Sequence, residues 1–316
     1  MLRGWCFLAV RQADGKHERE NVSRKASIEL QTGHHAQLIA GLAGNCVGPG
    51  IHPERFYRII YGMSDDMGIV VDMDSTKDIK IIYEDNHLLV VEKPQNILTQ
   101  GDQTGDEDLL TVLKDYIREK YNKPGNVYLG LVHRLDRPAG GVMVFAKTSR
   151  AASRLSDQIR TGVFGKTYLA IVHGVPDELS GTLVNYLVKD AATNTVKVLD
   201  DKATGGRVPG GRSDSAEGMP ADARKAVLDY EVRKAADGLA LVQIKLRTGR
   251  PHQIRVQFAA IGHPLYGDQK YGASLNEPGM QLALWSTGIT FIHPTLREQV
   301  TFSSDPPAVY PWTLFA

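Results

Sequence analysis

Residues 133–141 read HRLDRPAGG, and this stretch places one carboxylate, Asp136, between two arginines on a short polar segment. The apolar run YLGLV precedes it and the run VMVFA follows it. The pattern predicts a turn between two buried strands, ending in a flexible glycine pair. A carboxylate in this setting is either part of a structural ion pair or a catalytic group.

The size and composition of the chain are typical of a globular protein. It has 316 residues, of which 42% are hydrophobic and 23% are charged. No run approaches the roughly 18 apolar residues that cross a bilayer. The first residues contain only WCFLAV as an apolar centre, which is shorter than the usual core of a signal peptide. We therefore expect a cytoplasmic protein that does not bind membranes.

Cysteine and histidine usage argues against a metal centre. The two cysteines, Cys6 and Cys46, both lie near the start, so the remaining residues provide no disulfide framework, thiolate metal site or cysteine nucleophile. The ten histidines are scattered along the chain. The sequence predicts no metal site.

Positive charge is concentrated in two parts of the chain, although the net charge is only +1. One of these parts, residues 245–255, contains basic residues and no acidic residue. Residues 133–170 contain only two acidic residues beside a larger set of basic ones: Arg134, Arg137, Lys147, Arg150, Arg154, Arg160 and Lys166. Local basic surfaces of this kind are suited to phosphate groups, although each charge could also belong to a solvated helix face.

Strand patterns outnumber helix patterns from residue 79 onward. Two strands are predicted in 79–94 around a turn at residues 84–86, and helices in 109–121 and 149–162, the latter capped by Thr148 or Ser149 and stopped by Gly162. A third helix is predicted in 251–262, with Pro251 in its first turn. Further strands are predicted at 141–148, 166–174, 183–190, 225–235, 239–249, 281–294 and 298–304. The fold class is therefore α+β, with a mixed, largely antiparallel central sheet and flanking helices.

Two segments differ from this pattern. Residues 1–76 show no sustained period, and acidic residues slightly outnumber basic ones. We expect a poorly ordered extension or a start codon assigned too early, so a chain beginning at Met73 should fold and act like the full chain. Residues 77–316 form the expected catalytic domain. Within it, residues 200–223 are rich in Gly, Asp, Ser and Pro and are predicted to be a flexible insertion.

Four blocks of the chain together resemble the RluA-type pseudouridine synthases. HRLDRPAGGVMVFAKT is similar to the catalytic motif of that family. YEDNHLLVVEKPQNI precedes it, and FGKTYLAIVHG and LRTGRPHQIRVQFAAIGHPLYGDQKYG follow it in the family's order. The resemblance covers residues 79 to about 305 and implies isomerisation of uridine to pseudouridine in ribosomal or transfer RNA. This reaction needs a carboxylate near the sugar–base junction and a base taken out of its stack. It needs no cofactor, and no obligate protein partner is expected.

The resemblance also implies roles for individual residues. Asp136 is the expected nucleophile, Tyr168 the side chain that stacks on the target base, and Arg255 the partner of the catalytic carboxylate. The turn at residues 248–250, before the last helix, is a candidate phosphate seat. The expected RNA-binding residues are Arg134, Arg137, Arg150, Arg154, Lys166, Arg250 and His252.

The chain departs from the family at two places. Ala139-Gly140-Gly141 stands where the family commonly has Thr-Ser-Gly, so hydroxyl contacts are lost while the final glycine remains. Residues 1–76 do not resemble the small N-terminal RNA-binding domain that many members carry, which makes this a short-form member.

Two other functions compete with the isomerase. A catalytically silent RNA-binding protein could retain the fold, although Asp136, Tyr168 and Arg255 are all present. A carboxylate-pair glycosidase needs two acids that flank the bond, and the motif offers no second acid beside Asp136. The target uridine and the oligomeric state are not predicted.

Overall fold

The computed structural model describes residues 58–60, 70–72, 79–190, 192–199 and 220–316. The chain forms two compact units, Met1–Asp78 and Ile79–Ala316. In the first unit, β1 (Arg58–Ile60) pairs antiparallel with β2 (Val70–Asp72), two strands that the sequence did not predict. Most of residues 1–76 and 200–223 lies outside the described residues, so the predictions for these two segments stay predictions.

One mixed sheet of eleven strands organises the second unit. Its main path runs β3-β4-β6-β12-β7-β11-β10-β8-β9, with β13 beside β12 and β5 beside β6. Among these pairs only β6 and β12 are parallel. The strands are β3 (Ile81–Glu84), β4 (Leu88–Lys93), β5 (Gly130–Leu131), β6 (Gly140–Ala146), β7 (Gly165–His173), β8 (Ser180–Asp190), β9 (Thr195–Val198), β10 (Arg224–Ala236), β11 (Leu239–Leu246), β12 (Leu284–Ile292) and β13 (Gln299–Ser303). The α+β prediction with a largely antiparallel sheet is confirmed.

Two of the helices begin and end where the sequence predicts. In α2 (Leu109–Lys120) the Asp108 side chain accepts the first-turn N–H of Thr111. In α3 (Ser149–Thr161) Thr148 is the N-cap, and Gly162 ends the helix with φ 76°. Such left-handed termination favours glycine because a Cβ atom would be strained there.

The last helix differs from the prediction at its start. α4 (Gln253–Ala260) begins two residues after Pro251, because His252 has a φ of 50° and interrupts the helical conformation. Pro251 therefore precedes the helix instead of lying in its first turn. The strand β9 and the 3₁₀ helix Trp312–Phe315 were not predicted.

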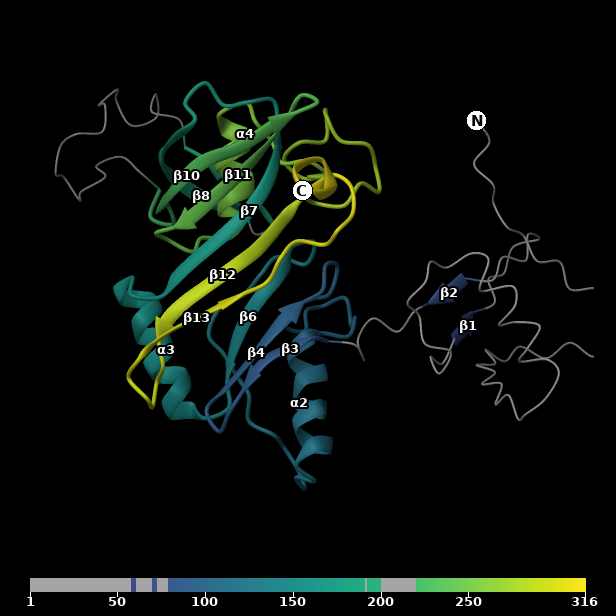
Figure 1. The fold of residues 1–316 in the computed structure, drawn as a ribbon, viewed down its shortest axis with the longest axis vertical. Helices are drawn as coiled ribbons and strands as arrows, with labels where there is room; N and C mark the ends of the chain where they lie inside the picture. Colours follow the sequence, from purple (N-terminus) through teal and green to yellow (C-terminus); the bar gives the residue numbers. More distant parts are fainter. Residues whose placement is uncertain (1–57, 61–69, 73–78, 191, 200–219) are drawn as a thin grey trace, which may run out of the picture. The chain divides into compact units, whose positions relative to one another are not determined.

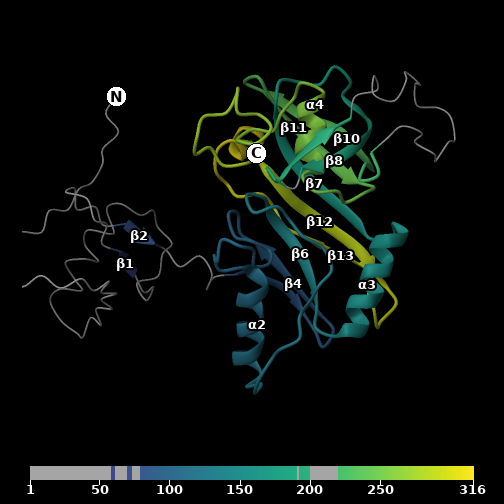
Figure 2. The same ribbon diagram turned by 180° about the vertical axis from the view of Figure 1, so that it is seen from behind.

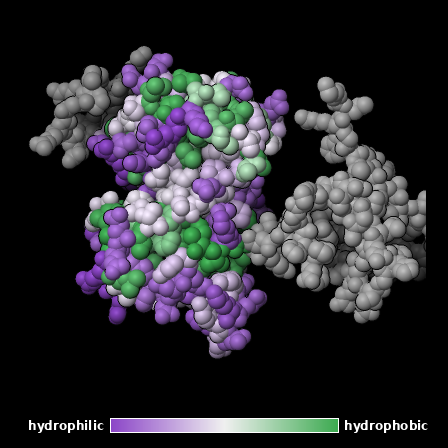
Figure 3. Space-filling model, in the orientation of Figure 1, coloured by the Kyte–Doolittle hydropathy of each residue, from purple (hydrophilic) through white to green (hydrophobic). Residues whose placement is uncertain are grey.

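The long strands β7 and β12 join two parts of this unit (Figures 1 and 2). On one face of the sheet, α2 and α4 pack into the same core through residues such as Leu113, Ile117, Ile254 and Phe258. A second core lies between α3 and the strands β4, β6 and β12. Figure 3 shows hydrophobic and hydrophilic patches alternating over the visible face. None of the described helices has the length and apolar character to span a membrane.

Candidate active site

The loop that carries Asp136 joins β5 to β6 and is held by one buried lysine. Lys93, the last residue of β4, is fully buried. Its ammonium group donates hydrogen bonds to the carbonyl oxygens of Pro94, Arg137 and Ala139 at 2.9, 3.1 and 2.7 Å. Burial lowers the pKa of Lys93 to about 7, although the negative charge of Asp136 raises it. Lys93 thus fixes the backbone on the C-terminal side of Asp136.

The glycine pair after Asp136 is required by the close approach of β12. A Cβ atom on Gly140 would lie 2.2 Å from a ring carbon of Trp285. Gly141 has a φ of 115°, and a Cβ atom there would lie 2.3 Å from the carbonyl oxygen of Ser286. The glycine at position 140, where the family commonly has serine, therefore matches the packing of Trp285 against the loop.

Arg255 links Asp136 to a second carboxylate that the motif analysis overlooked. Its Nη1 atom donates to Oδ2 of Asp136 at 3.3 Å. Its Nε and Nη2 atoms donate to the two carboxylate oxygens of Asp268, both at 2.7 Å. The Asp268 side chain is fully buried, whereas that of Asp136 is 27% exposed. One carboxylate therefore anchors the guanidinium, and the other keeps oxygen atoms free toward solvent.

The ionisation of this group follows from its contacts. Burial raises the pKa of Asp268, but hydrogen bonds and charge from Arg255 outweigh it, so the pKa is lowered. Backbone N–H groups of Lys270 and Tyr271 donate to the same carboxylate at 2.9 and 3.0 Å. Burial lowers the pKa of Arg255, but its contacts with Asp268 and Asp136 raise it overall. The pair is ionised, as a buried carboxylate and guanidinium with good geometry should be.

Tyr168 lies near enough to the loop that carries Asp136 to feel the charge of that carboxylate. It belongs to β7, is buried, and pairs with Ser286 of β12. Burial and the negative charge of Asp136 raise the pKa of its phenol, against a hydrogen bond with Ser286. The structure therefore brings together all three residues predicted to be catalytic: Asp136, Tyr168 and Arg255.

Tyr271 connects this site to His252. Its ring lies under the Arg255 guanidinium, 5.2 Å from ring centre to Cζ. Its hydroxyl group is 2.6 Å from Nδ1 of His252 and accepts the backbone N–H of Val196, in β9, at 2.8 Å. His252 feels the charge of Asp136. Of the predicted RNA-binding residues, His252 is therefore the one connected to Asp136 by successive contacts through Tyr271 and Arg255.

The other predicted RNA-binding residues are spread over several surfaces. Arg134 is exposed and makes no hydrogen bond or ion pair with any described residue. Arg137 is engaged by Asp106 at 2.6 Å, and the guanidinium beside Asp136 is that of Arg255. The Lys166 ammonium faces Gly249, in the turn before α4. Arg250 donates to the carbonyl oxygen of Lys225.

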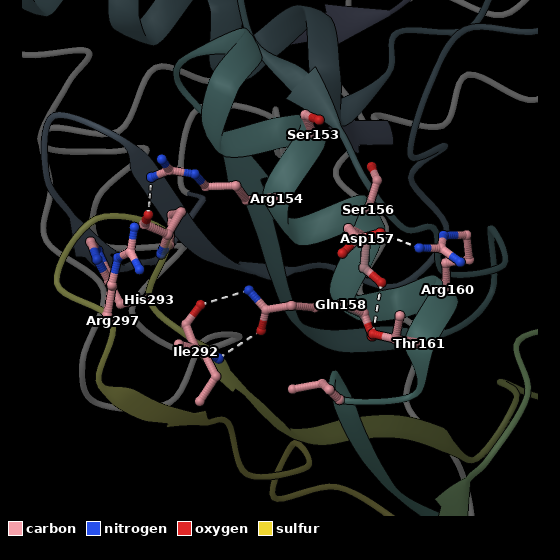
Figure 4. Close-up of a pocket in the computed structure, with 12 residues that line it drawn as sticks. Ser153, Arg154, Ser156, Asp157, Gln158, Arg160, Thr161, Ile292, His293 and Arg297 are labelled. Carbon is pink, nitrogen blue, oxygen red and sulfur yellow. Dashed lines mark hydrogen bonds and ion pairs between the residues drawn. The ribbon is translucent and has the colours of Figure 1, made fainter.

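A groove of about 850 Å³ runs between α3 and the connection from β12 to β13 (Figure 4). Gln158 holds this connection through the N–H and carbonyl groups of Ile292, and Arg154 donates to the carbonyl oxygen of Pro294. Arg160 pairs with Asp157 at 2.5 Å. The guanidinium groups that line the groove are those of Arg154, Arg160 and Arg297. Arg150 does not line it.

Sequence reasoning missed three residues that build the site: Lys93, Asp268 and Tyr271. Each lies in one of the four matched blocks, in EKP or in GDQKYG. The sequence does show a lysine at the end of an apolar strand and an aspartate in a polar turn. Neither pattern indicates which loop or side chain that residue contacts in the fold. Among the described residues no three His, Cys, Asp or Glu side chains converge as metal ligands would.

Known proteins are similar to this chain in both sequence and fold. The profile of the family described as RNA pseudouridylate synthase matches residues 87–260, which include Asp136, Tyr168 and Arg255. The human RNA pseudouridylate synthase domain containing 4 superposes with a TM-score of 0.56 and 25% identity, covering 72% of this chain and 88% of that one.

Curated bacterial relatives are also similar. Ribosomal large subunit pseudouridine synthase C of Buchnera aphidicola is 33% identical over 224 residues, 68% of this chain and 63% of the relative. An uncharacterized RNA pseudouridine synthase of Bacillus subtilis, YjbO, is 34% identical over 231 residues, 72% of each. Ribosomal large subunit pseudouridine synthase D of Zymomonas mobilis is 30% identical over 239 residues, 72% of this chain and 69% of the relative. The chain thus belongs to the RNA pseudouridylate synthase family, whose members are isomerases that act on RNA.

Proposed function

We propose that this protein isomerises uridine to pseudouridine in RNA, with Asp136 as the nucleophile. The observation that supports this most directly is the bond between Asp136 and Arg255, beside Tyr168. A carboxylate that is partly exposed and held by a buried guanidinium is oriented and accessible to a substrate.

The proposed reaction rearranges one nucleotide without adding or removing atoms. The bond between N1 of uracil and C1′ of ribose breaks, the base turns, and a bond between C5 and C1′ forms. C5 gives up its proton, and N1 gains one. A carboxylate oxygen of Asp136 bonds to C1′ as the N1–C1′ bond breaks, and this new bond breaks in turn when C5 bonds to C1′. Tyr168 packs against the base while it turns. The chain's own residues thus provide the nucleophile, its counter-charge and the stacking surface.

The uridine has to leave its stack before Asp136 can reach the glycosidic bond. Arg134 is two residues from Asp136, exposed, and without a partner among the described residues, which suits it to the RNA backbone or to the space that the base vacates. The Lys166 ammonium lies beside Gly249, and Arg250 follows that glycine in the chain, so both are candidates to bind phosphates of the RNA.

The substrate is proposed to be structured RNA, with large-subunit ribosomal RNA favoured. This preference rests on two relatives that match about 70% of the chain and are named as ribosomal large subunit pseudouridine synthases. Transfer RNA is the second candidate within the same reaction. The chain spans 63% of the first of these relatives.

The test uses purified full-length protein, RNA from a strain that lacks its gene, and a chelator in the buffer. Pseudouridine should form with the wild-type protein, and Asp136→Asn should reduce its formation to background, because the amide is not a nucleophile. The control is Asp106→Asn, which removes the same charge from an exposed pair with Arg137 and should retain turnover.

Two outcomes would contradict the proposal. Full turnover by Asp136→Asn would show that another group performs the reaction. RNA binding by the wild-type protein without any pseudouridine, in either RNA class, would favour the silent RNA-binding protein.

A further inference from the structure

The backbone of the loop that carries Asp136 is held on both sides of that residue. On the C-terminal side, Lys93 donates hydrogen bonds to two carbonyl oxygens of the loop. On the N-terminal side, the hydroxyl group of Thr99 donates to the carbonyl oxygen of Leu135 at 2.8 Å. That carbonyl belongs to the peptide bond between Leu135 and Asp136. The segment 93–99 thus holds the chain directly before and after the nucleophile.

The bond from Thr99 is buried, and no other group replaces it. Thr99 is 4% exposed and Leu135 is 7% exposed. The side chain of Leu135 packs in the same core as α2. Among the described residues no second donor reaches the carbonyl oxygen of Leu135. Without the hydroxyl group this oxygen would be a buried acceptor with neither protein nor water as its partner, which is unfavourable.

Thr99 is itself fixed to the start of α2. Its carbonyl oxygen accepts the N–H of Leu110 at 3.2 Å, and that of Leu98 accepts the N–H of Leu109 at 2.8 Å. The branched side chain of threonine has few allowed rotamers, so the backbone largely determines where its hydroxyl group points. A continuous series of hydrogen bonds and covalent bonds therefore runs from a rigid helix through Thr99 to the peptide bond of Asp136.

We propose that Thr99 is a positioning residue for the reaction, whose hydroxyl group fixes the peptide bond between Leu135 and Asp136 and thereby the direction of the Asp136 carboxylate. The inference rests on the proposed function, because it requires Asp136 to be the nucleophile. Thr99 lies outside the four sequence blocks that resemble the family. Since it is too buried to contact RNA, its loss should affect the chemical step and leave binding unchanged.

Two substitutions separate the hydroxyl group from the shape of the side chain. Thr99→Val keeps the branched shape and removes the donor. Its kcat at saturating RNA should fall roughly 10-fold, because a small displacement of a nucleophile is costly, while KM and RNA affinity stay within about 2-fold. Thr99→Ser keeps the hydroxyl group but loses the branch that restricts it, so its kcat should return to within about 3-fold of wild type.

The control is Tyr230→Phe, which removes a hydroxyl-to-carbonyl bond elsewhere in the fold. Tyr230, in β10, donates to the carbonyl oxygen of Glu178 at 3.0 Å. This variant should have a lower melting temperature and an unchanged kcat. If Thr99→Val is too unstable to purify, Thr99→Cys takes its place, because a thiol is a weaker donor than a hydroxyl group. The kcat should then decrease from threonine through serine to cysteine.

The inference would be overturned by a wild-type kcat in Thr99→Val, by a serine variant no more active than the valine or cysteine variant, or by a loss confined to KM. The proposed function is judged separately in the same assay. A wild-type protein without turnover contradicts that function. An active wild type, an inactive Asp136→Asn and a fully active Thr99→Val together contradict only the role of Thr99.

Discussion

Two buried carboxylates anchor cations in different parts of the fold: Asp268 in the loop after α4, and Glu84 at the end of β3. Asp268 takes two hydrogen bonds from Arg255 and two from backbone N–H groups. Glu84, at the end of β3, takes hydrogen bonds from four side chains and is only 7% exposed. Its partners are Lys120, Lys147, Tyr116 and Tyr121.

The difference lies in where each cation leads. Arg255 continues from Asp268 to Asp136, so one side of its guanidinium is structural and the other faces the site. The lysines on Glu84 lead back to α2 and to the end of β6, and none of its four hydrogen-bond partners bonds to Asp136. Hydrogen bonds from the two lysines lower the pKa of Glu84 to about 2 even though burial raises it. A strongly shifted pKa therefore marks a buried network, and only the contacts of that network show whether it serves the reaction.

The largest effect is expected for Asp268→Asn. The amide keeps the shape but offers one accepting oxygen in place of two and no charge, so the buried Arg255 loses the closer of its two counter-ions and keeps only Asp136. Breaking a buried pair in this way typically costs about 3–5 kcal/mol. Turnover should fall by roughly 100-fold as well, because Arg255 no longer holds Asp136 in place. Urea unfolding and pseudouridine formation by the same sample measure both effects.

The control for this substitution is Asp177→Asn, at an exposed position with no ion pair among the described residues. It should leave both the unfolding free energy and the turnover unchanged. If Asp268→Asn lost stability but retained wild-type turnover, Asp268 and Glu84 would be equivalent structural anchors, and the distinction between them would fail.

Glu84→Gln should destabilise the protein without affecting turnover in the folded protein. The folded pKa of about 2 lies below the ordinary glutamate value of 4.5, so ionised Glu84 stabilises the folded state above pH 4.5. That stabilisation is lost as the pH falls from about 4.5 to 2. The difference in unfolding free energy between wild type and Glu84→Gln should accordingly be full at pH 7 and shrink across this acid range.

The matched control is Glu119→Gln, on the same helix as Lys120 but exposed. It should show neither the loss at pH 7 nor the change in acid. A Glu84→Gln protein that is as stable as wild type at pH 7, or one whose turnover falls while its fold is intact, would contradict the assignment of Glu84 as a purely structural anchor.

The sequence motifs contain the three residues that the structure brings together, but they did not reveal the residues that support them. Asp136, Tyr168 and Arg255 lie in recognisable motifs, and the strands and helices around them follow from periodicity, caps and turn residues. Asp268 is 132 positions from Asp136 and reaches it only through Arg255, a relation that depends on how α4 packs on the sheet. The conformation of His252 was hidden for a similar reason. Pro251 predicted that the last helix begins at that residue. In the structure His252 instead has a left-handed conformation and a hydrogen bond with Tyr271.

The smallest effect is expected in the groove beside α3, where the cations are exposed and the pairs are weak. If phosphates of the RNA lie there, each arginine that contacts one should contribute about one unit to the slope of log affinity against log salt. Arg160→Ala and Arg297→Ala should each flatten the slope by about that amount, with kcat unchanged at saturating RNA. Arg118→Ala, which removes an arginine paired with Asp115 on α2, should leave the slope as it is. If all three variants kept the wild-type slope, the arginines of the groove would be solvated charges that do not contact RNA. A lower kcat in Arg160→Ala or Arg297→Ala would show that the groove affects the reaction at Asp136, and it would contradict the distinction between anchoring and binding charges.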